Sequence, residues 1–447
     1  MNKEKSNLYT PKIILSASSI IKLALRMMAN INRTIATHNE RTAYLALRLV
    51  QHHQMNSKCT NKNLLLLSLF HTIGFFKYDP LFNPNPFENE VNLFSTAKET
   101  ESKYVYGYYY LENMTPLKDS AIVLKFFNKD YQPELINFFP QAEYKSIIYL
   151  CARVNDYITN NPDKKLPEDL DSLFPEKLDP LYVQVFNKAN KDNKLIKKLN
   201  SGKYSDELLN IVNRIQYNEE DTKQLLKFVV YMLDFKSTST FAHTINTSCY
   251  ACSLAMRLGL SEEEIDILFA SALLHDIGKI AIPHVILEFP GKLSTEEMGI
   301  MRRHVNHTKK VLQGIVDDEI CENAFRHHEK LNGSGYPQQL TADEITLTQR
   351  ILTVADITSA LSDTRSYKGE FSKETMINIM NEMTQKGELD SSITHILETE
   401  FEEIHTEVIQ QREDLRVDYN NVFNKFYSYY ITDTSDFATE EAELEEL

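Results

Sequence analysis

Apolar residues recur at three- and four-residue spacing over most of this chain, and this periodicity limits its fold more than any other feature. It is clear in the stretches YLALRLVQHH, ELLNIVNRIQ and QLLKFVVYML. Glycine and proline, which interrupt helices, total only 12 and 14 among 447 residues. We therefore predict an all-α protein.

Two polar stretches, NNPDKKLPED and KANKDNKLIKKLNSGKYSDE, break the helical pattern in the middle of the chain. Such composition is typical of loops and linkers, and the length is sufficient for two or three domain cores. We place a domain boundary near residue 200, with domains over 1–200 and 201–400. Residues 401–447 are expected to form a C-terminal helix and a solvated acidic tail without a function of its own.

The net charge of −15 disfavours non-specific binding to nucleic-acid polymers or to anionic membranes. An anionic substrate would therefore need a local positive site. No apolar run approaches the roughly 20 residues that span a bilayer. The first 30 residues contain Lys22 and Arg26 and predict an amphipathic helix rather than a signal peptide, so we expect a cytoplasmic protein without a membrane anchor.

Five cysteines are scattered along the chain, an odd number that fits reduced thiols better than a disulfide framework. Cys249 and Cys252 form a CxxC pair inside a helical pattern. A zinc site usually needs a second pair of ligands, so packing in a core is the better interpretation of these two residues.

A weak internal repeat links the two halves of the chain. His38 in THNERTAYLALRLV has a counterpart in His243 of AHTINTSCYACSLAMRLGL. His71 in LSLFHTIGFF matches His275 in SALLHDIGKI at nearly the same offset. Two matches at one offset predict two related helical bundles.

The C-terminal half is rich in residues that can bind metal. In order, they are His243, His275, Asp276, His304, His327, His328, Glu329 and Asp356. Imidazole and carboxylate ligands suit Fe, Mn or Zn, and a dinuclear site needs about this many ligands and one bridging carboxylate, for which Asp276 is the natural candidate. A lone histidine on a helix is usually a surface or core residue, but so many ligands beside apolar helices favour a metal centre.

Two motifs in this region resemble the HD-GYP family of bacterial cyclic dinucleotide phosphodiesterases. They are HDIGK at residues 275–279 and HHEKLNGSGYP at residues 327–337, followed by Asp356 and by Arg365-x-Tyr367. A Gly-Ser-Gly-Tyr-Pro stretch alone would indicate only a turn; its position directly after HHE makes the match specific. The resemblance covers about residues 225–400 and implies two tandem HD-type bundles, the second an HD-GYP domain.

The resemblance also implies roles for individual residues. Metal ligands would be His243, His275, Asp276, His304, His327, His328 and Asp356. Catalytic roles fall to Asp276 and Lys279, and substrate contacts to Lys279, Gly335, Tyr336, Pro337, Arg365 and Lys368. Some members have a glutamate where this chain has Ser239, and its loss favours two metal ions, Fe or Mn, over three.

The N-terminal half departs from the pattern at every position but two. Thr72 replaces the aspartate of the HD pair and Phe75 the lysine after it. Lys103, Phe126-Phe127 and Arg153 stand at about the later ligand positions. We predict a degenerate, non-catalytic HD-like domain with a regulatory or dimerisation role, through a second copy or a protein partner. Its tyrosine run YVYGYYYL could be a base-stacking platform, but an interface is the favoured interpretation.

The predicted function is metal-dependent hydrolysis of a cyclic dinucleotide, cyclic di-GMP or 3′,3′-cyclic GMP-AMP, to the linear dinucleotide. Two metal ions can supply a nucleophile at neutral pH and stabilise charge on the phosphoryl oxygens. Two alternatives stay open: a catalytically idle receptor for cyclic dinucleotides that signals to a partner, and a general HD nucleotide phosphohydrolase. The GYP stretch argues against the second, and metal content with turnover would test the first.

Overall fold

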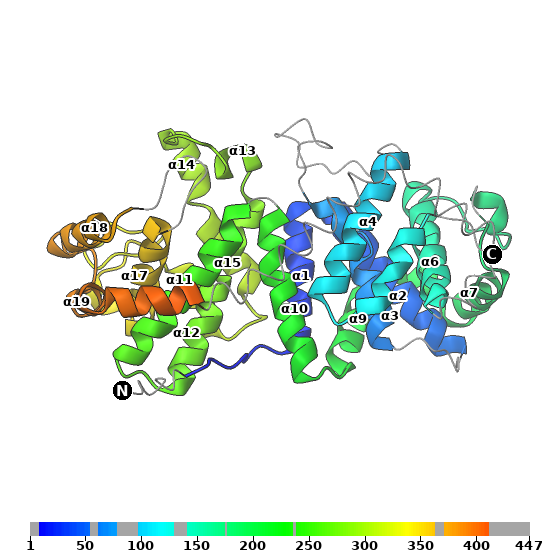
Figure 1. The fold of residues 1–447 in the computed structure, drawn as a ribbon. Coiled ribbons are helices and arrows are strands. Elements are labelled where there is room, and N and C mark those ends of the chain that lie inside the picture. Colours follow the sequence, from blue (N-terminus) through cyan, green and yellow to red (C-terminus); the bar gives the residue numbers. More distant parts are fainter. Residues whose placement is uncertain are drawn as a thin grey trace, which may run out of the picture. The chain divides into compact units, whose positions relative to one another are not determined.

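The computed structural model describes residues 9–53, 61–77, 97–128, 141–174, 177–235, 238–362 and 371–410. These residues form α-helices and short 3-10 helices (Figure 1). The one extended pairing among them is an isolated antiparallel bridge between Asn332 and Thr341. The all-α prediction is therefore confirmed.

The chain divides into two compact units, and the division differs from the boundary expected near residue 200. Within the described residues, the N-terminal unit comprises 28–225 and the C-terminal unit comprises 9–27 with 226–410. Both points of division fall inside continuous helices, α1 (Ala17–Ile31) and α10 (Glu219–Tyr231). The first polar stretch, 160–169, is a loop after α6 (Ala142–Asn160), whereas the second, 188–207, is largely helical and contains α8 (Leu195–Asn200). Both lie within the N-terminal unit, so neither marks the change of unit.

The N-terminal unit is built around α2, which contacts α3, α6, α7 and α9. Its elements are α2 (Arg33–His53), α3 (Asn61–Phe70), η1 (Ile73–Phe76), α4 (Ala97–Met114), η2 (Lys118–Phe126), α6 (Ala142–Asn160), η3 (Asp171–Leu173), α7 (Pro180–Asn193), α8 (Leu195–Asn200) and α9 (Tyr204–Arg214). Asp179 caps α7 by accepting a hydrogen bond from the Leu181 amide, with Pro180 at the first helical position.

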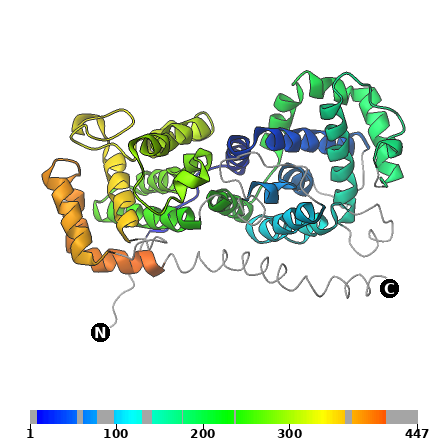
Figure 2. The ribbon, with the colours of Figure 1, turned by 90° about the horizontal axis from the view of Figure 1, so that it is seen from above.

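The C-terminal unit packs α11 against α12 and α17. Its elements are η4 (Met232–Phe235), α11 (Thr238–Arg257), α12 (Glu262–Leu274), η5 (Ile277–Ala281), α13 (His284–Leu287), α14 (Thr295–Met301), α15 (His304–Leu312), α16 (Asp318–Phe325), η6 (Ala342–Glu344), α17 (Leu347–Ser362), α18 (Lys373–Gln385) and α19 (Ser391–Thr399). Figure 2 shows α18 and α19, in orange, along one edge of this unit. Residues 401–410 are helical and bury Phe401, Ile404 and Val408.

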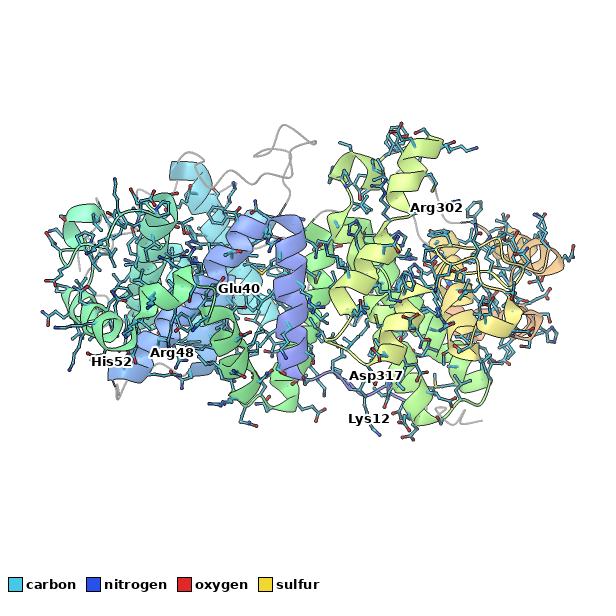
Figure 3. The ribbon with its side chains drawn as sticks, turned by 180° about the vertical axis from the view of Figure 1, so that it is seen from behind. Lys12, Glu40, Arg48, His52, Arg302 and Asp317 are labelled. Carbon is cyan, nitrogen blue, oxygen red and sulfur yellow. The ribbon has the colours of Figure 1, made fainter. Side chains whose placement is uncertain are left out.

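Residues 9–27 belong to the C-terminal unit although they are far from it in sequence. Asp266 accepts hydrogen bonds from the Tyr9 hydroxyl at 2.9 Å and from the Lys12 amide at 2.7 Å; Figure 3 labels Lys12 on this segment. Arg26 donates to the carbonyls of Val311 at 2.9 Å and Gln313 at 2.7 Å, at the end of α15. The predicted amphipathic helix is thus confirmed for 17–31, while 1–8 lie outside the described residues.

Other predictions concern burial. Cys249 and Cys252 are buried, and burial raises the pKa of the Cys249 thiol to about 12, as expected for thiols in a core. Tyr106, Tyr108 and Tyr110 are buried, which disfavours the base-stacking platform for these three, and the interface interpretation of the tyrosine run stays a prediction. The described part of the chain contains no helix that is both long and apolar enough to cross a membrane. The acidic tail lies outside the described residues.

Candidate metal centre

The C-terminal unit brings together the seven residues that the sequence suggested as metal ligands. They come from α11 (His243), the end of α12 (His275, Asp276), the start of α15 (His304), the turn after α16 (His327, His328) and α17 (Asp356). Four of them, His275, Asp276, His304 and His327, are at most 1% exposed, and Asp356 and His243 are buried at 6% and 8%. The His328 side chain is half-buried, with 26% of it exposed. Only His243 and Asp356 lie inside helices; helix ends and the turn after α16 supply the other donor atoms.

Gly278 allows α12 and α15 to place their ligands side by side. A Cβ at this position would lie 2.0 Å from the His304 carbonyl oxygen and 2.4 Å from the Thr308 amide. Thr308 completes the contact, because its hydroxyl accepts from the Gly278 amide at 3.0 Å and donates to the His275 carbonyl at 2.9 Å. The glycine of HDIGK is thus required by close backbone packing.

Three of the histidines share one mode of orientation. Nδ1 of His275, His304 and His327 lies 2.7, 2.8 and 2.7 Å from the carbonyl oxygen three residues earlier. A carbonyl only accepts, so each Nδ1 carries a proton and each Nε2 is the nitrogen that faces the centre. This tautomer is the one that a metal ligand needs.

The donor atoms form two groups with the Asp276 carboxylate between them. One group is His243, His275 and Asp276, and the other is His304, His327 and His328; within each, the donor atoms lie within 4.8 Å of one another. Oδ2 of Asp276 is 3.2 Å from His275 Nε2, and Oδ1 is 3.4 Å from His304 Nε2. Each carboxylate oxygen therefore faces a different group, which is the arrangement of a bridging ligand.

Asp356 forms the other side of the centre. Its Oδ1 is 2.9 Å from His243 Nε2, and its Oδ2 is 3.5 Å from His328 Nδ1. Ser359, one turn later on α17, lies 3.0 Å from Nδ1 of His243 and fixes the ring from behind. Oδ1 also lies 3.6 Å from His275 Nε2, so Asp356 contacts histidines of both groups.

The polar atoms at the centre fit divalent metal ions. Nε2 of His275 and both carboxylate oxygens of Asp276 are buried without a hydrogen bond of normal geometry. Burial alone would lower the pKa of His275, but Asp276 and Asp356 outweigh it and raise that pKa to about 10. Burial lowers the pKa of His304 to about 4 and that of His328 to about 3, so these rings are neutral. Two buried carboxylates among neutral imidazoles favour a cation at this point.

The predicted substrate-binding cations are only partly described. Lys279 Nζ lies 2.5 Å from Oδ2 of Asp276, and its side chain is 22% exposed. The structure therefore places Lys279 at the edge of the centre, paired with the carboxylate that lies between the two groups. Arg365 and Lys368 lie outside the described residues, as does the side chain of Ser239.

The loop after His328 places Gly335, Tyr336 and Pro337 beside the centre. The Tyr336 ring centroid is 4.7 Å from that of His328. A Cβ at Gly335 would lie 2.6 Å from Cα of Glu329, so the loop folds back tightly on the HHE stretch. Tyr336 therefore contacts a candidate ligand directly, while Gly335 permits the close approach.

Glu329 has a function that the sequence did not reveal. Its side chain is buried and accepts hydrogen bonds from the backbone amides of Gln338 at 2.6 Å and Leu340 at 3.0 Å. It is in neither donor group. Glu329 thus closes the loop instead of binding metal. The signal in the sequence was the position of Glu329 directly before the loop whose amides it binds. The same position is also compatible with a metal ligand.

The N-terminal unit has a similar local arrangement without the donor set. His71 Nδ1 lies 2.8 Å from the Ser68 carbonyl, and its Nε2 is 3.3 Å from Nε2 of His38. A Cβ at Gly74 would lie 1.9 Å from the Lys103 carbonyl, the contact that Gly278 makes with His304. The Phe127 ring packs 5.3 Å from that of His71. Both donor groups found among the described residues belong to the C-terminal unit.

Comparison with known proteins gives three findings. The HD domain family matches residues 227–393. The 3′3′-cGAMP-specific phosphodiesterase 1 of Vibrio cholerae is 36% identical over 179 residues, which are 40% of this chain and 42% of that protein. The cyclic di-GMP phosphodiesterase response regulator RpfG of Xanthomonas campestris is 37% identical over 185 residues, 41% of this chain and 48% of that protein. This chain thus spans less than half the length of these curated relatives.

A solved structure resembles the chain over a larger part of its length. The crystal structure of the cyclic GMP-AMP-specific phosphodiesterase V-cGAP3 of V. cholerae matches with a TM-score of 0.56, covering 88% of this chain and 98% of that one at 17% identity. This likeness shows a shared fold. Residues 227–393 of this chain thus match the HD domain family, and 40–41% of the chain is similar in sequence to curated bacterial phosphodiesterases for cyclic dinucleotides.

Proposed function

We propose that this protein is a metal-dependent phosphodiesterase that hydrolyses a cyclic dinucleotide to the linear dinucleotide. The observation that carries the proposal is the Asp276 carboxylate, whose two oxygens face two separate groups of histidines. A carboxylate in this position can bridge two metal ions. The relatives over residues 227–393 are named phosphodiesterases for cyclic di-GMP and 3′,3′-cyclic GMP-AMP, and we propose these two compounds as substrates.

Two divalent ions, Fe or Mn, are the proposed cofactors. His243, His275 and Asp276 would hold one ion, and His304, His327 and His328 the other, with Asp356 beside both groups. When bound, such ions supply a nucleophile at neutral pH and stabilise charge on phosphoryl oxygens. Mixed imidazole and carboxylate donors suit Fe and Mn.

The chain's own side chains would hold the substrate and exclude water. Lys279 lies at the edge of the centre, paired with Asp276. We propose that its ammonium group gives up part of this contact when it binds a phosphate oxygen of the substrate. Arg365 and Lys368 are proposed as further phosphate contacts. Gly335, Tyr336 and Pro337 form the wall beside His328, and the buried Glu329 side chain keeps that wall in place.

The N-terminal unit is proposed to be a degenerate HD-like domain without catalytic activity. Thr72 stands where the C-terminal unit has Asp276, and it donates its hydroxyl hydrogen bond to Asn39 at 2.9 Å. Two histidines without a neighbouring bridging carboxylate are a poor site for a metal pair. We propose regulation, dimerisation or binding of a protein partner as its role.

Product analysis tests this function most directly. Purified protein of measured metal content is incubated with cyclic di-GMP and with 3′,3′-cyclic GMP-AMP in parallel. We expect two metal ions per chain and a linear dinucleotide from at least one compound, and selective cleavage would name the substrate. Full metal occupancy with no cleavage of either compound would overturn the proposal in favour of a receptor or another nucleotide substrate.

A further inference from the structure

Arg302 is a cation near the candidate metal centre that has no carboxylate partner among the described residues. It lies between α14 and α15, two residues before His304, and its side chain is exposed (Figure 3). Its guanidinium group lies over the ring of Tyr336, whose centroid is 5.0 Å from Cζ of Arg302. Its five N–H donors are thus available to a ligand.

The Tyr336 ring connects this arginine to the metal ligands. Arg302 lies over Tyr336, and Tyr336 packs on His328 with ring centroids 4.7 Å apart. His328 in turn packs against His327 at 4.0 Å. The guanidinium group therefore lies on the Tyr336 ring, which packs directly on His328 of the second donor group. The contact with Tyr336 limits the freedom of the guanidinium group before any ligand binds.

We propose that Arg302 binds the phosphodiester of the cyclic dinucleotide that is not being cleaved; this inference rests on the proposed function. A cyclic dinucleotide has two phosphodiesters, each with one negative charge, and the candidate metal centre can take only one of them. The second must lie a nucleotide's length away, at the edge of the site. Arg302 lies over Tyr336, on which His328 packs, and it is an exposed cation without a carboxylate partner among the described residues of a chain whose net charge is −15.

Arginine suits this role better than lysine. Its planar guanidinium group can donate two parallel hydrogen bonds to two phosphate oxygens while one face stays on an aromatic ring. Such a contact would be present both before and during cleavage of the other phosphodiester, because it is remote from the reacting atoms. Loss of Arg302 should therefore raise KM and change kcat little.

The test compares Arg302→Gln and Arg302→Lys with the control Arg303→Gln in the full chain. Arg303 is the neighbouring exposed arginine, and its side chain makes no capping hydrogen bond at the start of α15. The substrates are the cyclic dinucleotide that the protein cleaves and bis(p-nitrophenyl) phosphate, which has a single phosphodiester and no second phosphate. Metal content is measured for every variant.

We expect Arg302→Gln to raise KM for the cyclic dinucleotide about tenfold, with kcat changed by less than about threefold. Arg302→Lys should give a smaller increase, and Arg303→Gln none. Kinetics with bis(p-nitrophenyl) phosphate and metal content should stay as in the wild type. Equal losses on both substrates would mean that Arg302 acts only by supporting Tyr336, and unchanged KM would mean no contact; either result overturns the inference.

The two proposals fail in different ways. If wild-type protein cleaves bis(p-nitrophenyl) phosphate but no cyclic dinucleotide, the proposed function fails and so does the inference that rests on it. If wild-type protein cleaves a cyclic dinucleotide and Arg302→Gln leaves KM unchanged, the inference about Arg302 alone fails.

Discussion

His71 in the N-terminal unit and His275 in the C-terminal unit have the same local backbone arrangement but different surroundings. Both His71 and His275 are anchored through Nδ1 to a carbonyl three residues earlier, at 2.8 and 2.7 Å. In both, a glycine three residues later contacts the backbone of the next long helix. The same centre as His275 contains Asp276, Asp356 and four more histidines, whereas His71 faces His38 and aromatic rings.

The pKa values of these two histidines show what the difference does. Burial, together with the neighbouring His38, lowers the pKa of His71 to about 3, and no carboxylate counters this effect as the Ser68 carbonyl partly does. The same burial acts on His275, but the carboxylates of Asp276 and Asp356 raise its pKa to about 10. One pocket thus excludes positive charge and the other favours it. The helical framework alone does not make a metal centre; the carboxylates do.

The largest expected effect is that of Asp276→Ala. The change removes the carboxylate that faces both donor groups and leaves core volume nearly intact, so hydrolysis should fall by more than about a hundredfold and metal content should fall with it. Circular dichroism should show unchanged helix content. Full activity in this variant would exclude the two-metal mechanism.

A matched pair of glycine substitutions compares the two frameworks. Gly278→Ala would bring a Cβ to 2.0 Å from the His304 carbonyl, and Gly74→Ala would bring one to 1.9 Å from the Lys103 carbonyl. Each should lower the free energy of unfolding by about 1–3 kcal/mol. Only Gly278→Ala should also reduce metal content, because it displaces α15 and His304.

Thermal unfolding and metal analysis of both glycine variants check this expectation. If Gly74→Ala depletes the metal as strongly as Gly278→Ala does, the N-terminal framework supports the centre directly. The separation of roles drawn from the two histidine pairs would then be wrong.

Glu329→Gln tests the loop after His328, which Glu329 closes beside the candidate metal centre. The glutamine keeps the size of the side chain but accepts with only one oxygen, so one of the amides of Gln338 and Leu340 loses its partner. We expect a loss of about 1–3 kcal/mol in the free energy of unfolding and about a tenfold loss of activity. Metal content should change little, since Glu329 is in neither donor group.

Glu322→Gln serves as the control for that variant. Glu322 pairs with Lys309 and Arg326 at the surface, and its side chain is 31% exposed. Loss of this pair should cost no more than about 1 kcal/mol and leave activity unchanged. Depletion of metal in Glu329→Gln would instead indicate that Glu329 is a ligand.

The smallest effect is expected for His71→Gln. His71 has no carboxylate beside it, so its replacement should change turnover by less than about twofold and leave metal content unchanged. Some loss of thermal stability is expected, because His71 is buried and packs on Phe127. A loss of activity comparable to that of Asp276→Ala would show that the N-terminal unit takes part in catalysis.

The sequence by itself determined the helical class and the inventory of donor residues. Sparse glycine and proline with helical periodicity leave little alternative to an all-α fold, because both are local properties of the chain. The blocks around His275 and His327 could be recognised because their residues are contiguous. The burial of Cys249 and Cys252 also followed from their position in an apolar helical pattern.

Only the tertiary structure decided how these residues are grouped. Spacing along the chain cannot show that Asp276 lies between two histidine groups, since its neighbours come from five separate helices and turns. It also could not show that Glu329 binds backbone amides, that Arg302 stacks on Tyr336, or that residues 9–27 belong to the C-terminal unit. The physical reason is that each depends on how the chain folds back on itself, across 9 to 11 residues for Glu329 and across longer separations for the others, which packing fixes and local composition does not encode.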